Sequence, residues 1–178
     1  SHKKENNPSV ADNQNNETTA EPTTEEETTT KVPTVEVDLM MIGDMLMHEG
    51  VVKSGLMDDG TYNFDHLYTN IAKDISSADI KIVNQETILG GSDFAYTGYP
   101  TFNSPWALGD AEVKAGFNII LHATNHTLDK GLKGVENCLS FWKTYHPDTT
   151  VLGINETEED YENIYVYEKE GFKIAFLN

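Results

Sequence analysis

The residues of this sequence that are best suited to chemistry come directly after apolar runs. The stretch HATNHTLDKG, residues 122–131, follows AGFNII, which is typical of a buried strand. Seven carboxylate, amide and imidazole side chains share this position after three such runs: Asp44, His48, Asn84, Glu86, Asn125, His126 and Asp129. Carboxylate oxygens, amide oxygens and imidazole nitrogens are ligands for divalent metals. Taken singly, each motif is also typical of a turn or a helix cap, but three in succession favour a metal-binding site.

Apolar runs and helical periodicities alternate along the chain from Val35 onward, and they predict the elements that position these side chains. Strands are predicted within residues 35–44, 78–83, 117–123 and 149–153, with two more in 162–178. Helices are predicted within residues 63–78, 103–116 and 131–146. This alternation indicates an α/β sheet that is at least partly parallel. Ligands of such sheets bind beyond the C-terminal ends of the strands, where the seven side chains are expected to meet.

Local signals predict how several of these elements begin, end and pack. The helix within 103–116 is expected to start at an N-cap formed by Asn103 or Ser104 and to end at Gly116. In the helix within 131–146, four residues share one apolar face: Leu132, Val135, Leu139 and Trp142. The single cysteine, Cys138, is predicted to be a buried structural thiol of that helix.

Two strands and a turn complete this set of predictions. The run Leu39–Ile42 is expected to be buried on both faces. The last strand, KIAFLN, is expected to be buried as well, after a tight turn at 169–171. Because a central strand is a poor place for a domain to end, we expect the chain to be the N-terminal part of something longer.

Composition limits the partners of this 178-residue chain. Thirty acidic residues outweigh twelve basic residues, all of them lysine, so the net charge is −18. Such a chain is not expected to bind nucleic acid or an anionic membrane by bulk attraction, and an anionic partner would need a local cation. Residues 1–33 are rich in Thr, Glu and Asn, and they predict a disordered tail or spacer before a domain at 34–178.

Several blocks together carry a resemblance to a known family. They are MIGDMLMH, ADIKIVNQETILGG, YPTFNSP, AGFNIILHATNHTLDKGLKGVENCLSF and GFKIAFLN. The chain from about residue 35 to 178 resembles the N-terminal half of the poly-γ-glutamate capsule-synthesis protein family (CapA/PgsA). That family resembles the calcineurin-like metallophosphoesterases. The resemblance implies an α/β fold with a metallophosphoesterase-type layered sheet and flanking helices, incomplete at its C-terminus.

The resemblance also implies a divalent metal cofactor, which would be Mn²⁺, Zn²⁺ or Fe²⁺. Asp44, Glu86 and Asn125 would be the metal ligands, and Glu86 would be able to bridge two metals. The spacing departs from the usual phosphoesterase pattern in one place. Those enzymes open with Asp-x-His, whereas GDMLMH places His48 four residues after Asp44.

The remaining residues would act on the substrate. By the same resemblance, His126 would be the acid or would orient the substrate, and Asp129 and His48 would be further catalytic groups. Asn84 would lie beside the substrate. Metal-assisted hydrolysis is the chemistry that such a set supports.

Three functions are compatible with these observations. The first is a surface-associated factor of poly-γ-glutamate or capsule biosynthesis that works as a metal-dependent hydrolase. The second is a non-catalytic assembly or polymer-handling component, and the third is a generic metallophosphodiesterase. The expected partners are poly-γ-glutamate and membrane synthase subunits. The expected location is the extracellular face of the cell membrane, reached through an anchor outside this chain.

Overall fold

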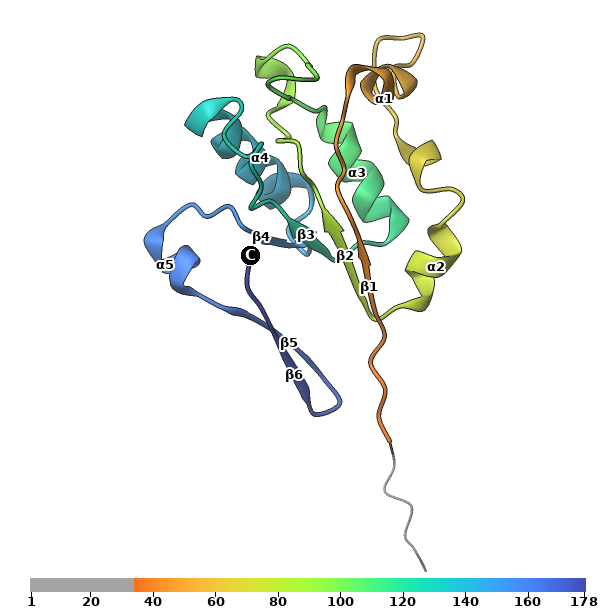
Figure 1. Ribbon diagram of the computed structural model, residues 1–178, viewed down its shortest axis with the longest axis vertical. Coiled ribbons are helices and arrows are strands. Elements are labelled where there is room, and N and C mark those ends of the chain that lie inside the picture. The colour runs from red at the N-terminus through yellow and green to blue at the C-terminus, as the bar shows by residue number, and fades with distance from the viewer. Residues whose placement is uncertain (1–33) are drawn as a thin grey trace, which may run out of the picture. The chain divides into compact units, whose positions relative to one another are not determined.

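Four short parallel strands form the sheet that carries the candidate site (Figure 1). The computed structural model describes residues 34–178, so the predicted tail at 1–33 lies outside the described part and the domain boundary stays a prediction. The strands lie in the order β1-β2-β3-β4. Their bounds are Leu39–Ile42, Ile80–Asn84, Ile119–Leu121 and Thr150–Leu152. All three neighbouring pairs are parallel, as the alternation of strands and helices predicted.

Helices cover one face of this sheet and a hairpin packs against the other. The helices of that face are α1 (Glu49–Ser54), α2 (Ala72–Ser77), α3 (Trp106–Ala115) and α4 (Gly131–Tyr145). The short helix α5 (Glu158–Glu162) lies in the connection between β4 and the hairpin. The hairpin joins β5 (Tyr165–Lys169) to β6 (Phe172–Phe176). On the helical face, Val83 and Ile120 of the sheet share one buried cluster with Leu108 of α3 and Phe141 of α4. The mixed α/β architecture expected from the sequence is therefore confirmed.

The hairpin covers only part of the second face, so two predictions of burial were wrong. Leu39 and Met41 of β1 are 50% and 55% exposed, because β1 is an edge strand and the cluster beneath the hairpin is built on Ile80, Ile82 and Ile119. The strand KIAFLN belongs to β6, which pairs with β5 and lies outside the parallel sheet. It is half-exposed because alternate residues point away from the sheet.

The helix predicted within 63–78 is broken, although its apolar residues are buried as a helical face would be. A 3₁₀ turn occupies Asp65–Leu67, and the α-helix begins only at Ala72. The Asn63 side chain accepts a hydrogen bond from the Asp65 backbone N–H at 2.9 Å. Asparagine favours such local turns, which compete with helix formation.

The predictions for α3 and α4 were right about existence and wrong about some details. Pro105 is the N-cap of α3, while Asn103 is buried and its side chain donates to the Gly91 carbonyl at 2.9 Å. Gly116 ends the helix in the left-handed conformation, as predicted. Leu132 is 75% exposed, whereas Trp142 of the same predicted face is buried with Cys138 and Phe141. Cys138 is buried as expected.

The turn between β5 and β6 was predicted correctly. The short helices α1 and α5 were not predicted from the sequence. Glu170 and Gly171 both have positive φ angles, which suits a tight hairpin turn. Thr157 and Asp160 form a reciprocal capping box that starts α5. Among residues 34–178, no helix is both long and apolar enough to cross a membrane.

Candidate functional site

Backbone hydrogen bonds tie the ends of the first three strands together. The Met45 N–H donates to the Asn84 carbonyl at 2.9 Å, and the Gln85 N–H donates to the Leu121 carbonyl at 2.9 Å. The loop that follows β3 is joined in the same way, because the Thr124 hydroxyl donates to the Glu86 carbonyl at 2.7 Å. The segments that carry the predicted site residues therefore meet at one edge of the sheet.

Asp44, which follows β1, meets Asn84 at the end of β2. The Asn84 side-chain amide donates to Oδ1 of Asp44 at 2.5 Å. Asp44 is exposed, so this hydrogen bond orients a carboxylate that remains open to solvent. The arrangement agrees with the sequence expectation that strand ends bring these two residues together.

Glu86 is a largely buried acid of the cluster. Its side chain is 12% exposed, and its Oε2 atom is buried without a hydrogen-bond partner among residues 34–178. Burial, and after it the negative charge of Asp44, raises the pKa of the Glu86 carboxyl above its ordinary value of 4.5. Two carboxylates are thus held close together, one of them partly removed from water.

His126 faces Glu86 and is held from behind by Asp129. Its Nε2 atom lies 3.9 Å from Oε1 of Glu86, and its Nδ1 atom lies 2.7 Å from Oδ2 of Asp129. The side chains of His126 and Asp129 are 16% and 13% exposed. A carboxylate that accepts a hydrogen bond from Nδ1–H leaves Nε2 without a proton when the imidazole is neutral. The imidazole is therefore arranged to exchange a proton on its Glu86 side.

Phe102 is a residue of this site that sequence reasoning missed. Its backbone N–H donates to the same Oδ2 atom of Asp129, at 2.7 Å. Its ring lies edge-on between two imidazoles, with centroids 4.6 Å from His126 and 5.3 Å from His48. An apolar loop residue carries no chemical signal. Its membership of the YPTFNSP block and its place beside Asn103 were the only hints in the sequence.

The structure places His48 and Asn125 at the margin of the cluster. His48 is the N-cap of α1, is exposed, and contacts Phe102. Asn125 is exposed, and within the described residues no hydrogen bond joins it to Asp44 or Glu86. Six of the seven predicted residues are therefore linked by contacts, directly or through Phe102, while Asn125 is linked by chain position alone.

The chemistry of these residues fits a divalent cation only in part. A cation would give the buried Oε2 atom of Glu86 a partner and would offset its repulsion from Asp44. However, the described residues contain no group of three or more His, Cys, Asp or Glu side chains arranged to hold a metal. The side chains of this cluster therefore suit a cation that takes few protein ligands and completes its coordination shell with water or substrate oxygens.

Fold and site together define a class of protein. It is an α/β protein whose parallel strands deliver carboxylate, amide and imidazole groups to the C-terminal edge of the sheet. The model of the family described as bacterial capsule synthesis protein PGA_cap matches residues 38–178, and the chain belongs to this family. The family has a metallophosphoesterase-like fold and is associated with capsule synthesis. No curated protein matches the chain.

Proposed function

We propose that this chain acts in bacterial capsule synthesis as a cation-dependent hydrolase whose site is the cluster around Asp44 and Glu86. The observation that carries the proposal is the buried Oε2 atom of Glu86, which has no hydrogen-bond partner among residues 34–178. A second carboxylate, that of Asp44, lies near enough to raise the pKa of Glu86. Two close carboxylates repel each other, and burial makes that repulsion more costly. A bound divalent cation would remove both costs.

Mn²⁺ or Mg²⁺ suits the side chains around Asp44 and Glu86 better than Zn²⁺. Zinc is usually held by three or four His, Cys or carboxylate ligands, and residues 34–178 offer no such group. Mg²⁺ keeps several waters and is bound through one or two carboxylates. Asp44 and Glu86 would hold the cation, and Asn84 would keep the Asp44 carboxylate oriented toward it.

When bound, such a cation would supply Lewis-acid polarisation of a scissile group and a more acidic water. The residues of this chain would do the remaining work. His126 would move a proton at Nε2, on the side that faces Glu86. Asp129 would keep the Nδ1 proton in place and thereby fix the tautomer.

Poly-γ-glutamate is the substrate or product that we propose for this site. The polymer is a polyanion and the chain has a net charge of −18, so long-range attraction does not favour contact. A cation at the strand ends would provide local attraction for a carboxylate of the polymer. We further propose that the protein works with membrane synthase subunits at the extracellular face of the membrane. That part of the proposal is supported by the family and by the composition of residues 1–33.

A non-catalytic role in capsule assembly is the second candidate. The observation that favours it is the small number of candidate metal ligands in the described residues. In this case the polar strand ends would bind the polymer or a partner through hydrogen bonds alone. A generic phosphodiesterase would share the cation site but would not act on γ-glutamyl polymer.

Calorimetric titration of Mn²⁺ into the full chain tests the cation site directly. Binding is expected in the wild type and should be abolished in Asp44→Asn and Glu86→Gln. Asp58→Asn is the matched control, because Asp58 is an exposed acid on a different loop. Circular dichroism of each variant confirms folding. Unchanged Mn²⁺ binding in both site variants would contradict the proposal.

Hydrolysis assays then separate the functions. Release of products from poly-γ-glutamate that needs Mn²⁺ and Glu86 would support the capsule hydrolase. Cleavage of bis-p-nitrophenyl phosphate without cleavage of the polymer would favour the generic phosphodiesterase. Binding of the polymer without cleavage of either substrate would favour the assembly role.

A further inference from the structure

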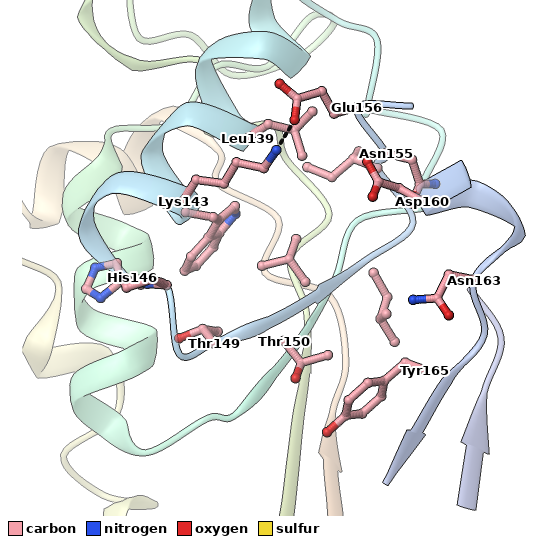
Figure 2. Close-up of a pocket in the computed structure, with 15 residues that line it drawn as sticks. Leu139, Lys143, His146, Thr149, Thr150, Asn155, Glu156, Asp160, Asn163 and Tyr165 are labelled. Carbon is pink, nitrogen blue, oxygen red and sulfur yellow. Dashed lines mark hydrogen bonds and ion pairs between the residues drawn. The ribbon is translucent and has the colours of Figure 1, made fainter. Parts of the chain in front are cut away.

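A cavity of about 390 Å³ lies apart from the site described above, between α4, β4 and α5 (Figure 2). Its apolar lining includes Leu139 and Trp142 of α4 and Ile154 after β4. Figure 2 shows Lys143 and Glu156 at one end and Thr150 and Tyr165 at the other. None of the seven predicted site residues lines this cavity, which we call the β4 groove.

The outer edge of β4 borders the groove. Within residues 34–178, β4 pairs with β3 on one side and with no strand on the other. The Thr150 N–H donates to the Asn118 carbonyl at 3.1 Å, and the Leu152 carbonyl accepts from the His122 N–H at 2.8 Å. Because backbone groups of successive strand residues point to opposite sides, the N–H and carbonyl of Val151 face the groove. An open strand edge of this kind is a template for pairing with another chain.

Acidic residues outnumber the single lysine around the groove. Glu156 and Asp160 line it, and α5 adds three further acids: Glu158, Glu159 and Glu162. The one lysine of the lining, Lys143, is already paired with Glu156. This pairing raises the pKa of Lys143 above its ordinary value. The rim therefore complements positive charge.

We infer that the β4 groove binds an extended peptide segment of a partner protein, with alternating apolar and basic residues, as an added strand beside Val151. The backbone of the segment would pair with the Val151 N–H and carbonyl. Its apolar side chains would enter the cavity over Leu139 and Trp142, and its basic side chains would meet Glu156 and the acids of α5. A small apolar molecule would fill the cavity but would leave the edge groups of Val151 and the acidic rim unused.

The short edge sets the strength of this interaction. β4 has three residues, so few backbone hydrogen bonds can form and the contact is of the weak, transient kind. The inference does not depend on the proposed hydrolase activity, because none of the residues that line the β4 groove belongs to the cation site.

The test uses the full chain and a fluorescein-labelled octapeptide of alternating Val and Lys, followed by fluorescence anisotropy. Saturable binding is expected. The same peptide with N-methyl groups on alternate residues keeps its charge but cannot pair, and its Kd should rise by about tenfold or more. A Val-Glu octapeptide should not bind. Equal binding of the methylated and unmethylated peptides would overturn the inference, and so would failure of the Val-Lys peptide to bind.

Two variants locate the contact. Glu156→Lys should weaken Val-Lys binding severalfold or more, whereas Asp74→Asn, an exposed acid on α2, should not. Circular dichroism and Mn²⁺ titration of Glu156→Lys establish that the fold and the cation cluster are intact. Analytical ultracentrifugation of the peptide-free chain completes the test. A stable dimer that the peptide does not dissociate would assign the edge to a second copy and overturn the inference.

Discussion

The imidazole of His126 is fixed by Asp129, because its Nδ1 atom lies 2.7 Å from Oδ2 of that carboxylate. The contact turns the other ring nitrogen, Nε2, toward Glu86 at 3.9 Å. Both side chains are largely buried, so the pair has little contact with water. This relationship assigns the two histidine nitrogens different tasks and makes the orientation of His126 testable.

Removing the Asp129 carboxylate should disable His126 without removing it. In Asp129→Ala, hydrolysis is expected to fall by about 10- to 100-fold, as for other residues that orient a site histidine. Asp129→Asn should retain more activity, because its amide oxygen can still accept the Nδ1 proton. The measurements are kcat/KM and the ¹⁵N shifts of His126, which report its tautomer. Wild-type ¹⁵N shifts in Asp129→Ala would contradict the assignment.

The protonation of Glu86 should control cation binding. Because burial and Asp44 raise the pKa of Glu86 above 4.5, the carboxyl takes up a proton at a higher pH than an ordinary glutamate. Mn²⁺ affinity should therefore rise with pH by up to about tenfold per unit and level off above that pKa. Carbon-13 NMR of the Glu86 carboxyl, without metal, should show a lower pKa in Asp44→Asn. An unchanged Glu86 pKa in that variant would mean that the two carboxylates are not coupled.

Glu112 should make the fold less stable as pH rises. Both of its carboxylate oxygens are buried without hydrogen-bond partners in the described part of the chain, and burial raises its pKa well above 4.5. The protonated form is favoured in the folded state, so its stabilising effect is complete below pH 4.5 and is lost as pH increases through the folded-state pKa. Relative to Glu112→Gln, the free energy of unfolding should fall by about 1.4 kcal/mol per pH unit in that window.

Urea unfolding of the wild type and Glu112→Gln between pH 4.5 and 8 measures this difference. Tyr68→Phe is the control, since the Tyr68 hydroxyl is the other buried, unpartnered group beside Glu112 among residues 34–178. It should change stability without changing the pH slope. Parallel pH profiles for the wild type and Glu112→Gln would show that Glu112 does not titrate in this way.

Phe102 should contribute both to the stability of the fold and to the positions of His48 and His126. Phe102→Ala removes a ring that is 1% exposed, and such core truncations cost about 3–5 kcal/mol. Phe102→Leu should cost less and keep the backbone hydrogen bond to Asp129. In Phe102→Leu, proton NMR should show the ring-current shifts of His48 and His126 lost together. Loss at only one histidine would mean that Phe102 does not link them.

The sequence was sufficient to predict the strand ends of this site. Short apolar runs such as 117–123 are strong strand signals, and parallel strands carry their C-terminal ends to one edge whatever the loops do. Asp44, Asn84, Glu86 and His126 could be grouped for that reason alone. The family match covers residues 38–178, the range in which these four residues lie.

Other features depend on contacts between distant segments, which local patterns do not contain. Asparagine favours helix caps, but the buried side chain of Asn103 instead donates a hydrogen bond to the Gly91 carbonyl. Leu132 fits the apolar period of α4, yet the core lies on the side of Cys138 and Phe141. Phe102 becomes a site residue only through the folding of its loop against Asp129, which the local sequence pattern does not show.

The backbone hydrogen bonds from Met45 to Asn84 and from Gln85 to Leu121 have a consequence for rates as well as for geometry. They lie just beyond the strands, so the main chain under the polar cluster is ordered once the sheet has formed. Only side chains then need to rearrange when a ligand arrives, and side-chain rotations take picoseconds to nanoseconds. Capture at this edge should therefore be limited by encounter and desolvation, and no slow opening of the fold should precede it.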